Sequence, residues 1–197
     1  DSLSKEQQQK YVDISLNNAR QLKRLIDQIF ELAHLDSETV ILHTEPLGIA
    51  EFAQDVLQKM ALEASNKKIS LNIEPKDSSI MVMANIEKLE SVITNIIENA
   101  LRHCEAGDSI NIELLPSKNA GHLSVSIKDT GLGIAEKDIP LIFDAHFKAS
   151  NSVRGKGRNS GLGLAISKRI IELHGSELKV ISALGEGTQF SFELKSA

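Results

Sequence analysis

The glycines of this chain lie almost entirely in its second half. Of the twelve glycines among 197 residues, only Gly48 precedes residue 107, whereas nine lie between Gly131 and Gly187. Glycine adopts backbone conformations and tolerates close contacts that side chains prevent. We therefore expect long regular elements in the first half of the chain, and in the second half tight turns that bring backbone close to a ligand.

Composition and charge exclude several classes of protein. Hydrophobic residues make up 41% of the chain and the net charge is −5, as is typical of a folded protein. The acidic total argues against nucleic acid as a partner. No apolar run approaches the roughly 18 residues that cross a bilayer, so we expect a membrane to be involved only through upstream segments that this chain lacks. The lone Cys104 cannot form an internal disulfide, which indicates a reducing, cytoplasmic location.

A basic segment interrupts this acidic chain. Between Ala145 and Ile171 there are six basic residues, no acidic residue and four glycines. A charged run alone is typical of a solvated loop, but basic side chains beside glycine-rich backbone indicate an anion site. The polar stretch over 146–160 is long for a loop within a compact domain, so we expect it to be a lid.

Hydrophobic periodicity predicts a helical arm followed by an α/β sandwich. Residues 5–36 contain neither glycine nor proline and carry an apolar stripe at helical spacing, so we expect one long helix with a face that needs a partner. Further helices are expected over 47–65, 86–104, 136–143 and 162–174. Alternating patterns predict strands over 69–74, 80–83, 109–115, 123–128, 177–181 and 189–194.

The helix over 86–104 carries the first candidate site. Five polar residues lie at i, i+3, i+4, i+7 and i+8 and therefore share one face: Asn95, Glu98, Asn99, Arg102 and His103. Asparagine is a poor helix former, so two of them one turn apart indicate either a merely exposed face or a functional one. Amide oxygens with a carboxylate suit Mg²⁺ that is bound together with phosphate.

Three glycine pairs supply the other candidate motifs. Residues 129–133 (Asp-Thr-Gly-Leu-Gly) follow an expected strand, where the carboxylate can accept a hydrogen bond from an exocyclic amine such as that of adenine. Residues 160–164 (Ser-Gly-Leu-Gly-Leu) open a helix, and a helix N-terminus is an anion site. Residues 185–188 (Gly-Glu-Gly-Thr) have the composition of a hairpin turn. The chain contains neither a Walker A loop nor a complete Rossmann fingerprint.

Taken in order, these motifs resemble the ATP-binding domain of bacterial sensor histidine kinases. Asn95 and Asn99 resemble the N box of that family, 129–133 the G1 box, Phe143 the F box, and 161–164 and 185–188 the G2 and G3 boxes. The resemblance implies an α+β protein: a two-layer α/β sandwich of the Bergerat or GHKL type, with a mixed sheet and helices on one face, preceded by a long N-terminal helix. It also implies that 1–37 is the second helix of the dimerisation and phosphoacceptor hairpin and that 38–197 is the catalytic domain.

The resemblance further implies ATP and Mg²⁺ as ligands and a role for individual residues. Asn99, with Asn95, is expected to hold Mg²⁺, and Asp129 is expected to bind the adenine amine. The residues expected to carry catalysis are Asn95, Glu98, Asn99 and Lys148. Those expected to contact the nucleotide are Asn95, Asn99, Arg102, His103, Asp129, Gly131, Gly133, Ile134, Phe143, Lys148, Gly161, Leu162, Gly163, Leu164 and Thr188.

The family's phosphoacceptor motif is absent, since none of the six histidines has its sequence context. We therefore expect little or no self-phosphorylation, and transfer of the ATP γ-phosphoryl to a histidine on an upstream helix that is missing here. The resemblance implies a response regulator or phosphorelay receiver domain as partner, and a homodimer in the full-length protein.

Two alternative functions belong to different classes. ATPases of the gyrase, mismatch-repair and Hsp90 kind share this fold and place a Glu general base four residues before the Asn that binds Mg²⁺. That position is Asn95 here, and an amide does not take a proton from water, which favours phosphotransfer over hydrolysis. The second alternative is a non-enzymatic, nucleotide-gated interaction module that docks through the helix over 5–36. The intact glycine motifs argue against it.

Overall fold

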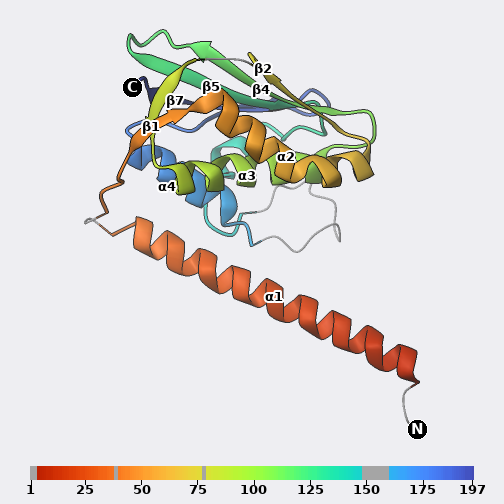
Figure 1. Ribbon diagram of the computed structural model, residues 1–197. Coiled ribbons are helices and arrows are strands. Elements are labelled where there is room, and N and C mark those ends of the chain that lie inside the picture. Colours follow the sequence, from red (N-terminus) through yellow and green to blue (C-terminus); the bar gives the residue numbers. More distant parts are fainter. Residues whose placement is uncertain (1–3, 38–39, 77–78, 148–159) are drawn as a thin grey trace.

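The computed structural model describes residues 4–37, 40–76, 79–147 and 160–197 (Figure 1). Its elements are α1 (Lys5–Leu35), β1 (Glu45–Gly48), α2 (Ile49–Lys67), β2 (Ser70–Glu74), β3 (Met81–Ala84), α3 (Ile86–His103), β4 (Ser109–Pro116), β5 (His122–Asp129), the 3-10 turn η1 (Ile139–Leu141), α4 (Gly163–Leu173), β6 (Lys179–Ala183) and β7 (Gly187–Lys195).

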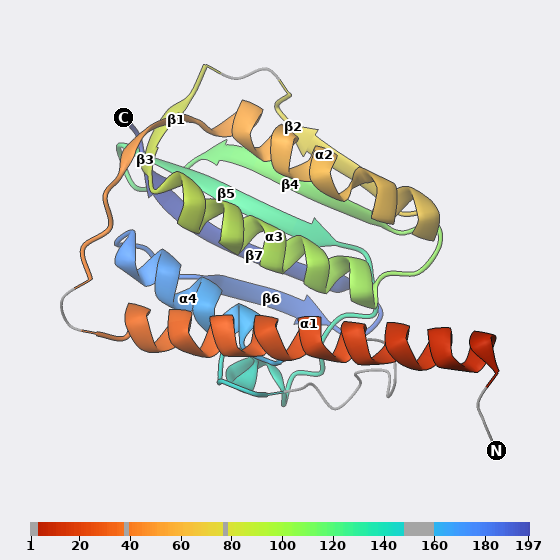
Figure 2. The same cartoon turned by 60° about the horizontal axis from the view of Figure 1, so that its bottom comes forward.

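Five strands form a mixed sheet in the order β2-β4-β5-β7-β6. Strands β2 and β4 are parallel, and the other neighbours are antiparallel. Helices α2, α3 and α4 lie side by side on one face of this sheet (Figure 2). The two-layer α+β sandwich with helices on one face is therefore confirmed, and so is the long N-terminal helix.

The core lies between the helices and the sheet. On β4 and β5 the residues that face the helices alternate with polar ones and are all buried: Ile110, Ile112, Leu114, Leu123, Val125 and Ile127. Helix α3 contributes the largest share from the other side: Leu89, Val92, Ile93, Ile96, Ile97, Ala100 and Leu101. Burial of each large aliphatic side chain contributes about 1.5–3 kcal/mol. This packing fixes the axis of α3, and hence the position of its polar face.

Two local predictions were wrong. The second helix was expected to begin at Leu47, but Glu45–Gly48 forms β1, which pairs with β3, and α2 begins at Ile49. The pairing with β3 is a long-range contact that local periodicity does not contain. The helix expected over 136–143 is only the 3-10 turn η1, in which Pro140 has no N–H to donate to a longer helix.

Helix α1 is long and largely exposed. It starts with a capping box, in which Ser4 Oγ accepts from the Gln7 amide and Gln7 Oε1 accepts from the Ser4 amide. Its last turn meets α4, and Leu35 is completely buried there. Among the described residues, none of the helices is long and apolar enough to cross a bilayer.

Candidate functional site

The amide face of α3 lies against the N-terminal turn of α4. Asn95 Nδ2 is 3.5 Å from Gly163 O and 3.4 Å from Ser167 Oγ. A Cβ at Gly163 would lie 3.4 Å from Asn95 Oδ1, which is van der Waals contact, so a side chain there would touch Asn95 directly. The structure thus brings together the asparagine motif and the glycine motif at 160–164, which are far apart in sequence.

Asn99 lies one turn further along the same face of α3. Its Oδ1 is 3.4 Å from Arg102 Nη1, which is a long contact, and both side chains are half-buried. Burial lowers the pKa of Arg102, and the nearby carboxylates of Glu98 and Glu63 oppose that shift. Glu98 is exposed. An amide oxygen therefore lies beside a guanidinium, an arrangement that can face a phosphate and its metal ion.

Asp129 is held at the end of β5 by backbone donors. Its Oδ1 accepts from the Gly131 N–H at 3.0 Å and from the Thr188 N–H at 3.2 Å, and the residue is buried. Burial raises the pKa of Asp129, and the two backbone hydrogen bonds work against that rise. A carboxyl fixed through one oxygen can accept a hydrogen bond from a ligand amine through the other.

The glycines around Asp129 are required by close contact within the protein itself. Gly133 and Gly187 have φ values of +68° and +87°. A Cβ at Gly133 would lie 1.9 Å from Ala183 O, and a Cβ at Gly187 would lie 2.0 Å from Asp129 O. The turn after β5 therefore packs backbone against backbone on the β6–β7 hairpin. Contact of these glycines with a nucleotide stays a prediction.

Ser182 connects these two turns and was missed from sequence. Its Oγ accepts from the Ile134 N–H and donates to Gly187 O, both at 2.8 Å, and it lies 3.0 Å from Thr188 Oγ1. Two of the predicted nucleotide contacts, Ile134 and Thr188, are therefore joined by one hydroxyl. The expected strand over 177–181 ended two residues before the observed end of β6 at Ala183, which left Ser182 outside it.

The end of α3 forms another side of the Asp129 turn. His103 O accepts from the Leu132 N–H at 3.2 Å, and a Cβ on Gly131 would lie 2.7 Å from the same oxygen. Burial lowers the pKa of His103, with a further contribution from Arg102. Burial raises the pKa of the neighbouring Cys104 to about 12, so this thiol stays protonated.

Phe143, Leu162 and Leu164 pack into or against the core beside the site. Phe143 meets Phe190 edge to face, with ring centroids 6.3 Å apart, and Lys168 Nζ lies 5.6 Å from the Phe143 ring centroid. Leu162 is buried, and Leu164 packs against the core. These contacts show that Phe143, Leu162 and Leu164 support the packing beside the site. Direct contact of these three residues with a nucleotide stays a prediction.

Local hydrogen bonds hold the segment that precedes α4. Ser160 Oγ accepts from the Leu162 N–H at 3.1 Å, and Gly161 O accepts from the His146 N–H at 3.0 Å. Gly161 has a φ of +71°, and a Cβ there would lie 2.8 Å from His146 Cα. Lys148, predicted to contact phosphate, and most of the expected lid over 146–160 lie outside the described residues.

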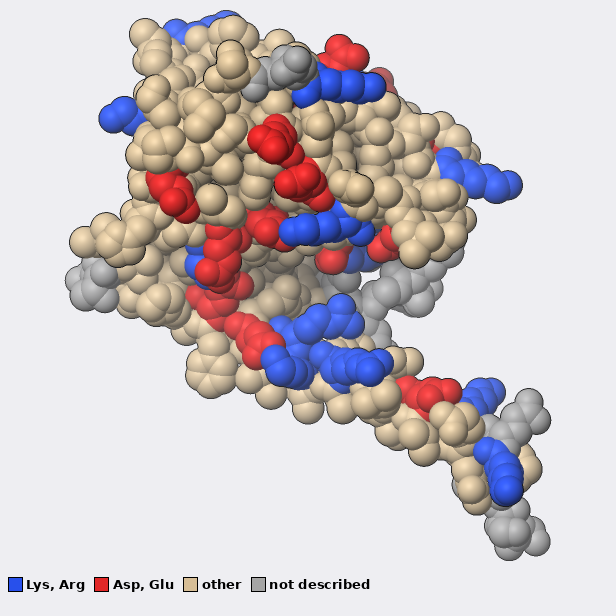
Figure 3. All heavy atoms as spheres, viewed as in Figure 1, with Lys and Arg blue, Asp and Glu red and all other residues tan. Residues whose placement is uncertain are grey.

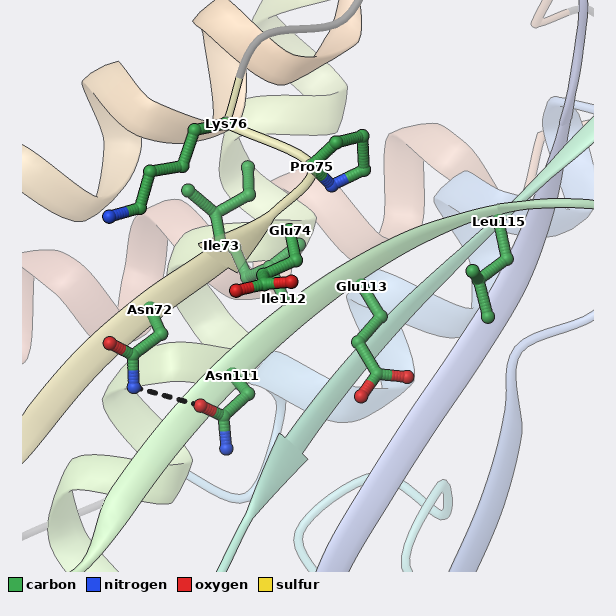
Figure 4. Close-up of a pocket in the computed structure, with 9 residues that line it drawn as sticks. All are labelled: Asn72, Ile73, Glu74, Pro75, Lys76, Asn111, Ile112, Glu113 and Leu115. Atoms are coloured by element: carbon green, nitrogen blue, oxygen red, sulfur yellow. Dashed lines mark hydrogen bonds between the residues drawn. The ribbon is translucent and has the colours of Figure 1, made fainter.

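A separate cavity of about 680 Å³ lies on the open face of the sheet, at β2 and β4 (Figure 4). Asn72 and Asn111 line it and are joined by a 2.9 Å hydrogen bond, with Glu74 and Glu113 two pairs further along the strands. None of the residues predicted to bind nucleotide lines this cavity. The candidate site is therefore the region between α3, the start of α4 and the Asp129 turn.

Known proteins match this chain over most of its length. It is 29% identical over 188 residues to the sensor protein GacS of Pseudomonas syringae pv. syringae, covering 94% of this chain and 21% of GacS. It is 32% identical over 182 residues to the sensor protein SrrB of Staphylococcus aureus, covering 92% of this chain and 30% of SrrB. The chain thus spans less than a third of the length of these relatives.

Solved structures and a family model give the same result. Full-length ShkA in complex with AMPPNP superimposes with a TM-score of 0.83 at 27% identity, covering 100% of this chain and 41% of ShkA. The mycobacterial sensor histidine kinase MprB gives 0.66 at 26% identity, covering 77% and 98%. The model of histidine kinase-, DNA gyrase B- and HSP90-like ATPases matches residues 84–197, which hold all the predicted site residues. The resemblance seen in the sequence is confirmed: this chain belongs to that ATPase family, among the relatives of the sensor histidine kinases.

Proposed function

We propose that this chain is the catalytic part of a two-component sensor histidine kinase. It binds Mg²⁺-ATP and transfers the γ-phosphoryl to a histidine on a dimerisation helix outside this chain. The observation that carries the proposal is the contact of Asn95 with Gly163, because it sets the amide face of α3 against the start of α4. A hard-oxygen face beside a helix N-terminus suits a phosphate chain and its metal ion.

The adenine end of the site is assigned to Asp129. Backbone donors hold its Oδ1, so its other oxygen is left to accept from the exocyclic amine of adenine. Guanine presents a carbonyl at the corresponding ring position, and a carboxylate repels a carbonyl. We infer that Asp129 selects adenine over guanine nucleotides.

The phosphate end is assigned to Asn95, Asn99 and Arg102, with backbone amides of Gly161 and Gly163. The described residues contain no cluster of three or more His, Cys, Asp or Glu suited to a metal ion. Mg²⁺ takes few protein ligands when phosphates and waters supply the others. Asn99, with Asn95, would hold Mg²⁺ here, and the ion would neutralise charge on the phosphates.

The chain's own residues act mainly by positioning and by charge. Phosphoryl transfer needs little covalent chemistry from the protein, so fixed donors and cations carry most of the effect. Arg102, half-buried beside Asn99, supplies one cation, and Lys148 is proposed as another. Glu98 is exposed on the same helix, where its carboxylate is proposed to polarise the acceptor imidazole.

Hydrolysis is the second candidate, and the position of Asn95 disfavours it. The ATPases of this fold need a carboxylate there, and the Asn95 amide is instead engaged with α4 through Gly163 and Ser167. Glu98 is one residue away from the Mg²⁺-binding position and is exposed. Sustained phosphate release without an acceptor would favour the hydrolytic function instead. A purely nucleotide-gated interaction module predicts binding without transfer.

Partners and location follow from the proposed activity. A structure of histidine kinase ThkA in complex with its response regulator TrrA shares the fold of this chain, at a TM-score of 0.77 and 21% identity. We propose a response regulator or receiver domain as the partner, a homodimer in the longer protein, and a cytoplasmic location.

Phosphotransfer in trans tests the proposal. The chain is incubated with γ-labelled ATP and a second polypeptide that carries a phosphoacceptor hairpin. We expect acid-labile label on that polypeptide, little or none on the chain itself, and a loss of about 100-fold or more in Asn99→Ala. The matched control Asn72→Ala, on the open face of the sheet, keeps the parent's rate. Label retained in Asn99→Ala, or robust label on the chain alone, contradicts the proposal.

A further inference from the structure

A row of polar side chains crosses the helix-facing side of the sheet at the Asp129 turn. Asp129 of β5 is in register with Thr188 of β7, and Thr188 is in register with Ser182 of β6. Side chains of paired residues in neighbouring strands point to the same face of a sheet. Two pairs further into the sheet, this face carries only apolar side chains on the same three strands: Ile127, Phe190 and Val180. The polar row therefore lies where the apolar core ends.

Two members of the polar row are buried, which few polar residues of this molecule are. Figure 3 shows Lys, Arg, Asp and Glu side chains spread over the outer surface of the helices. Among the described residues, only five polar or charged ones are buried: Ser126, Asp129, Asp138, Ser167 and Thr188. Of these, only Asp129 and Thr188 are in register on neighbouring strands. A buried polar group is costly unless it is hydrogen-bonded, so the bonds of the polar row determine which of its atoms are left for a ligand.

The Ser182 hydroxyl uses all of its hydrogen-bonding capacity within the protein. A hydroxyl has one hydrogen to donate and two lone pairs that accept. Gly187 O lies 2.8 Å from Ser182 Oγ, and because a carbonyl has no hydrogen to donate, Ser182 is the donor. One lone pair of Ser182 Oγ accepts from the Ile134 N–H at 2.8 Å. The other lone pair is left for Thr188 Oγ1, which lies 3.0 Å away.

The direction of the Thr188 hydroxyl follows from these bonds. Since Ser182 has no hydrogen left, Thr188 Oγ1 is the donor in the contact between the two hydroxyls. The Thr188 N–H is also engaged, because it donates to Asp129 Oδ1 at 3.2 Å. Thr188 therefore has only the lone pairs of Oγ1 to offer a ligand, next to the second carboxylate oxygen of Asp129. Two neighbouring acceptors require a ligand group that donates.

We propose that Ser182 is a positioning residue of the adenine end: it takes the hydrogen of the Thr188 hydroxyl, so that Thr188 Oγ1 meets the nucleotide only as an acceptor. The inference rests on the proposed function, because it concerns the same site. The exocyclic amine of adenine has two hydrogens, which suit one acceptor on Asp129 and one on Thr188, directly or through a bridging water. The carbonyl of guanine has none.

Removal of the Ser182 hydroxyl frees the hydrogen of Thr188. The Thr188 hydroxyl then rotates and points this hydrogen at the adenine amine for part of the time, so that two donors face each other. The cost is about a two- to tenfold loss of affinity, the range for a single side-chain hydrogen bond. Because the effect passes through the amine, a nucleotide without an amine does not experience it.

Binding of two nucleotides with Mg²⁺ to the full chain, measured by calorimetry, tests the inference. One is ADP, and the other is purine riboside diphosphate, which lacks only the exocyclic amine. We expect Ser182→Ala to bind ADP about two- to tenfold more weakly than the parent, and to bind the purine nucleotide with the parent's affinity. Ser182→Thr keeps a hydroxyl on a residue that suits a strand, and should restore the parent's affinity for ADP.

Ser191→Ala is the matched control. Ser191 lies on the neighbouring strand β7, at a position that alternates with the core residues Phe190 and Phe192, so its side chain points to the opposite face of the sheet. This variant removes the same hydroxyl group from the same sheet. It should keep the parent's affinity for both nucleotides.

Thr188→Val separates the positioning role from folding. Valine has the shape of threonine without the hydroxyl, and the bonds of Ser182 to Ile134 and Gly187 stay in place. Thr188→Val should lose at least as much ADP affinity as Ser182→Ala and no affinity for the purine nucleotide. Adding Ser182→Ala to it should weaken ADP binding no further, because both act through one hydroxyl. If urea denaturation shows that Ser182→Ala alone does not fold, Thr188→Val and Ser182→Thr carry the test.

Equal weakening of both nucleotides by Ser182→Ala overturns the inference, since Ser182 would then only hold the β6–β7 hairpin in shape. Undiminished ADP binding by Ser182→Ala, or by Thr188→Val, overturns it as well. In each of these cases the parent still binds ADP, so the proposed function stands and only the role of Ser182 fails. If the parent does not bind ADP at all, the proposed function fails and the inference with it.

Discussion

Helices α1 and α3 are both amphipathic but differ in what covers their apolar faces. The 18 residues of α3 bury seven apolar side chains against the sheet and its neighbouring helices. Among the residues of α1 whose side chains the structure describes, only Leu35 is buried, although the helix carries more apolar side chains than α3. Large apolar residues remain exposed along it: Tyr11, Val12, Ile14, Leu16, Leu22, Ile26, Ile29 and Phe30.

The difference shows what amphipathicity does and does not determine. The pattern predicts that a helix has an apolar face, but the partner of that face comes from tertiary structure. For α3 the partner is the sheet of the same chain. Apart from its last turn, where Leu32 and Leu35 pack against the core, most of the apolar face of α1 has no cover among the described residues. This supports the proposal that α1 pairs with helices of a longer, dimeric protein.

The largest expected effect concerns the glycines at which backbone packs against backbone. Helix α1 contains no glycine and has no contact of this kind. Gly133→Ala puts an alanine at a φ of +68° and places its Cβ 1.9 Å from Ala183 O, so the β6–β7 hairpin must move. We expect a loss of about 3 kcal/mol or more in the free energy of unfolding. Gly175→Ala is the control, because Gly175 has a φ of +78° but open space around its Cβ position. It should cost only the conformational strain, about 1–2 kcal/mol. Equal losses measured by urea denaturation contradict this explanation.

Truncating the apolar face tests the comparison itself. Ile93→Ala removes a completely buried side chain from α3 and should cost about 2–5 kcal/mol. Ile26→Ala, at a 44% exposed position of α1, should change stability by less than about 0.5 kcal/mol in the monomer. The measurement is urea denaturation at low protein concentration. A comparable loss in both variants would show that the α1 face is already covered, and the contrast would be wrong.

Leu35 is the position of α1 that should behave like α3. It is completely buried against α4, so Leu35→Ala should cost about 2–3 kcal/mol. Leu22→Ala, 59% exposed on the same helix, should fall within about 0.5 kcal/mol of the parent. If denaturation shows Leu35→Ala to be as neutral as Leu22→Ala, α1 is not anchored at its end.

The smallest effect is a dependence of stability on pH through His174. Its Nε2 accepts from the Asn85 N–H at 3.0 Å, and its Nδ1 lies 2.8 Å from Ile170 O, so the neutral ring joins the end of α4 to the start of α3. Burial lowers the pKa of His174. The unfolded chain therefore binds a proton at higher pH than the folded one, and stability falls as pH drops below about 6.5.

A pair of variants isolates this contribution. Unfolding free energies at pH 7.5 and 5.5 should differ more in the parent than in His174→Gln, which cannot take up the proton. His34→Gln, at an exposed position of α1, is the matched control and should keep the parent's dependence on pH. An unchanged pH dependence in His174→Gln would place its source elsewhere.

Much of the fold could be predicted because its signals are local. Neighbouring residues alone indicate the apolar stripe of α3, the β4–β5 hairpin and the turns that contain glycine. Strand β1 was missed because its pairing of Leu47 with Val82 is a long-range contact. The strand that carries Ser182 was placed two residues early for a related reason, since its register is set by β7.

The site was predicted in the same uneven way. The motifs identified Asn95, Asn99 and Asp129, and the structure adds the groups that hold them. Those groups were not visible in sequence because they come from distant segments: Ser167 beside Asn95, the Thr188 amide on Asp129, and Gln28 beside Ser160. The glycines were predicted to approach a ligand, and their closest observed contacts are with the protein's own backbone.

Binding of adenine and guanine nucleotides to the parent and to Asp129→Asn tests the central claim most directly. Asparagine keeps an oxygen for the Gly131 and Thr188 amides but presents an NH₂ group to the adenine amine. With Mg²⁺ present, we expect the parent to bind AMPPNP and not its guanine counterpart, and Asp129→Asn to lose about 100-fold or more in AMPPNP affinity while unfolding at the same urea concentration. Equal affinity of the parent for the two nucleotides, or undiminished AMPPNP binding by Asp129→Asn, would contradict the account.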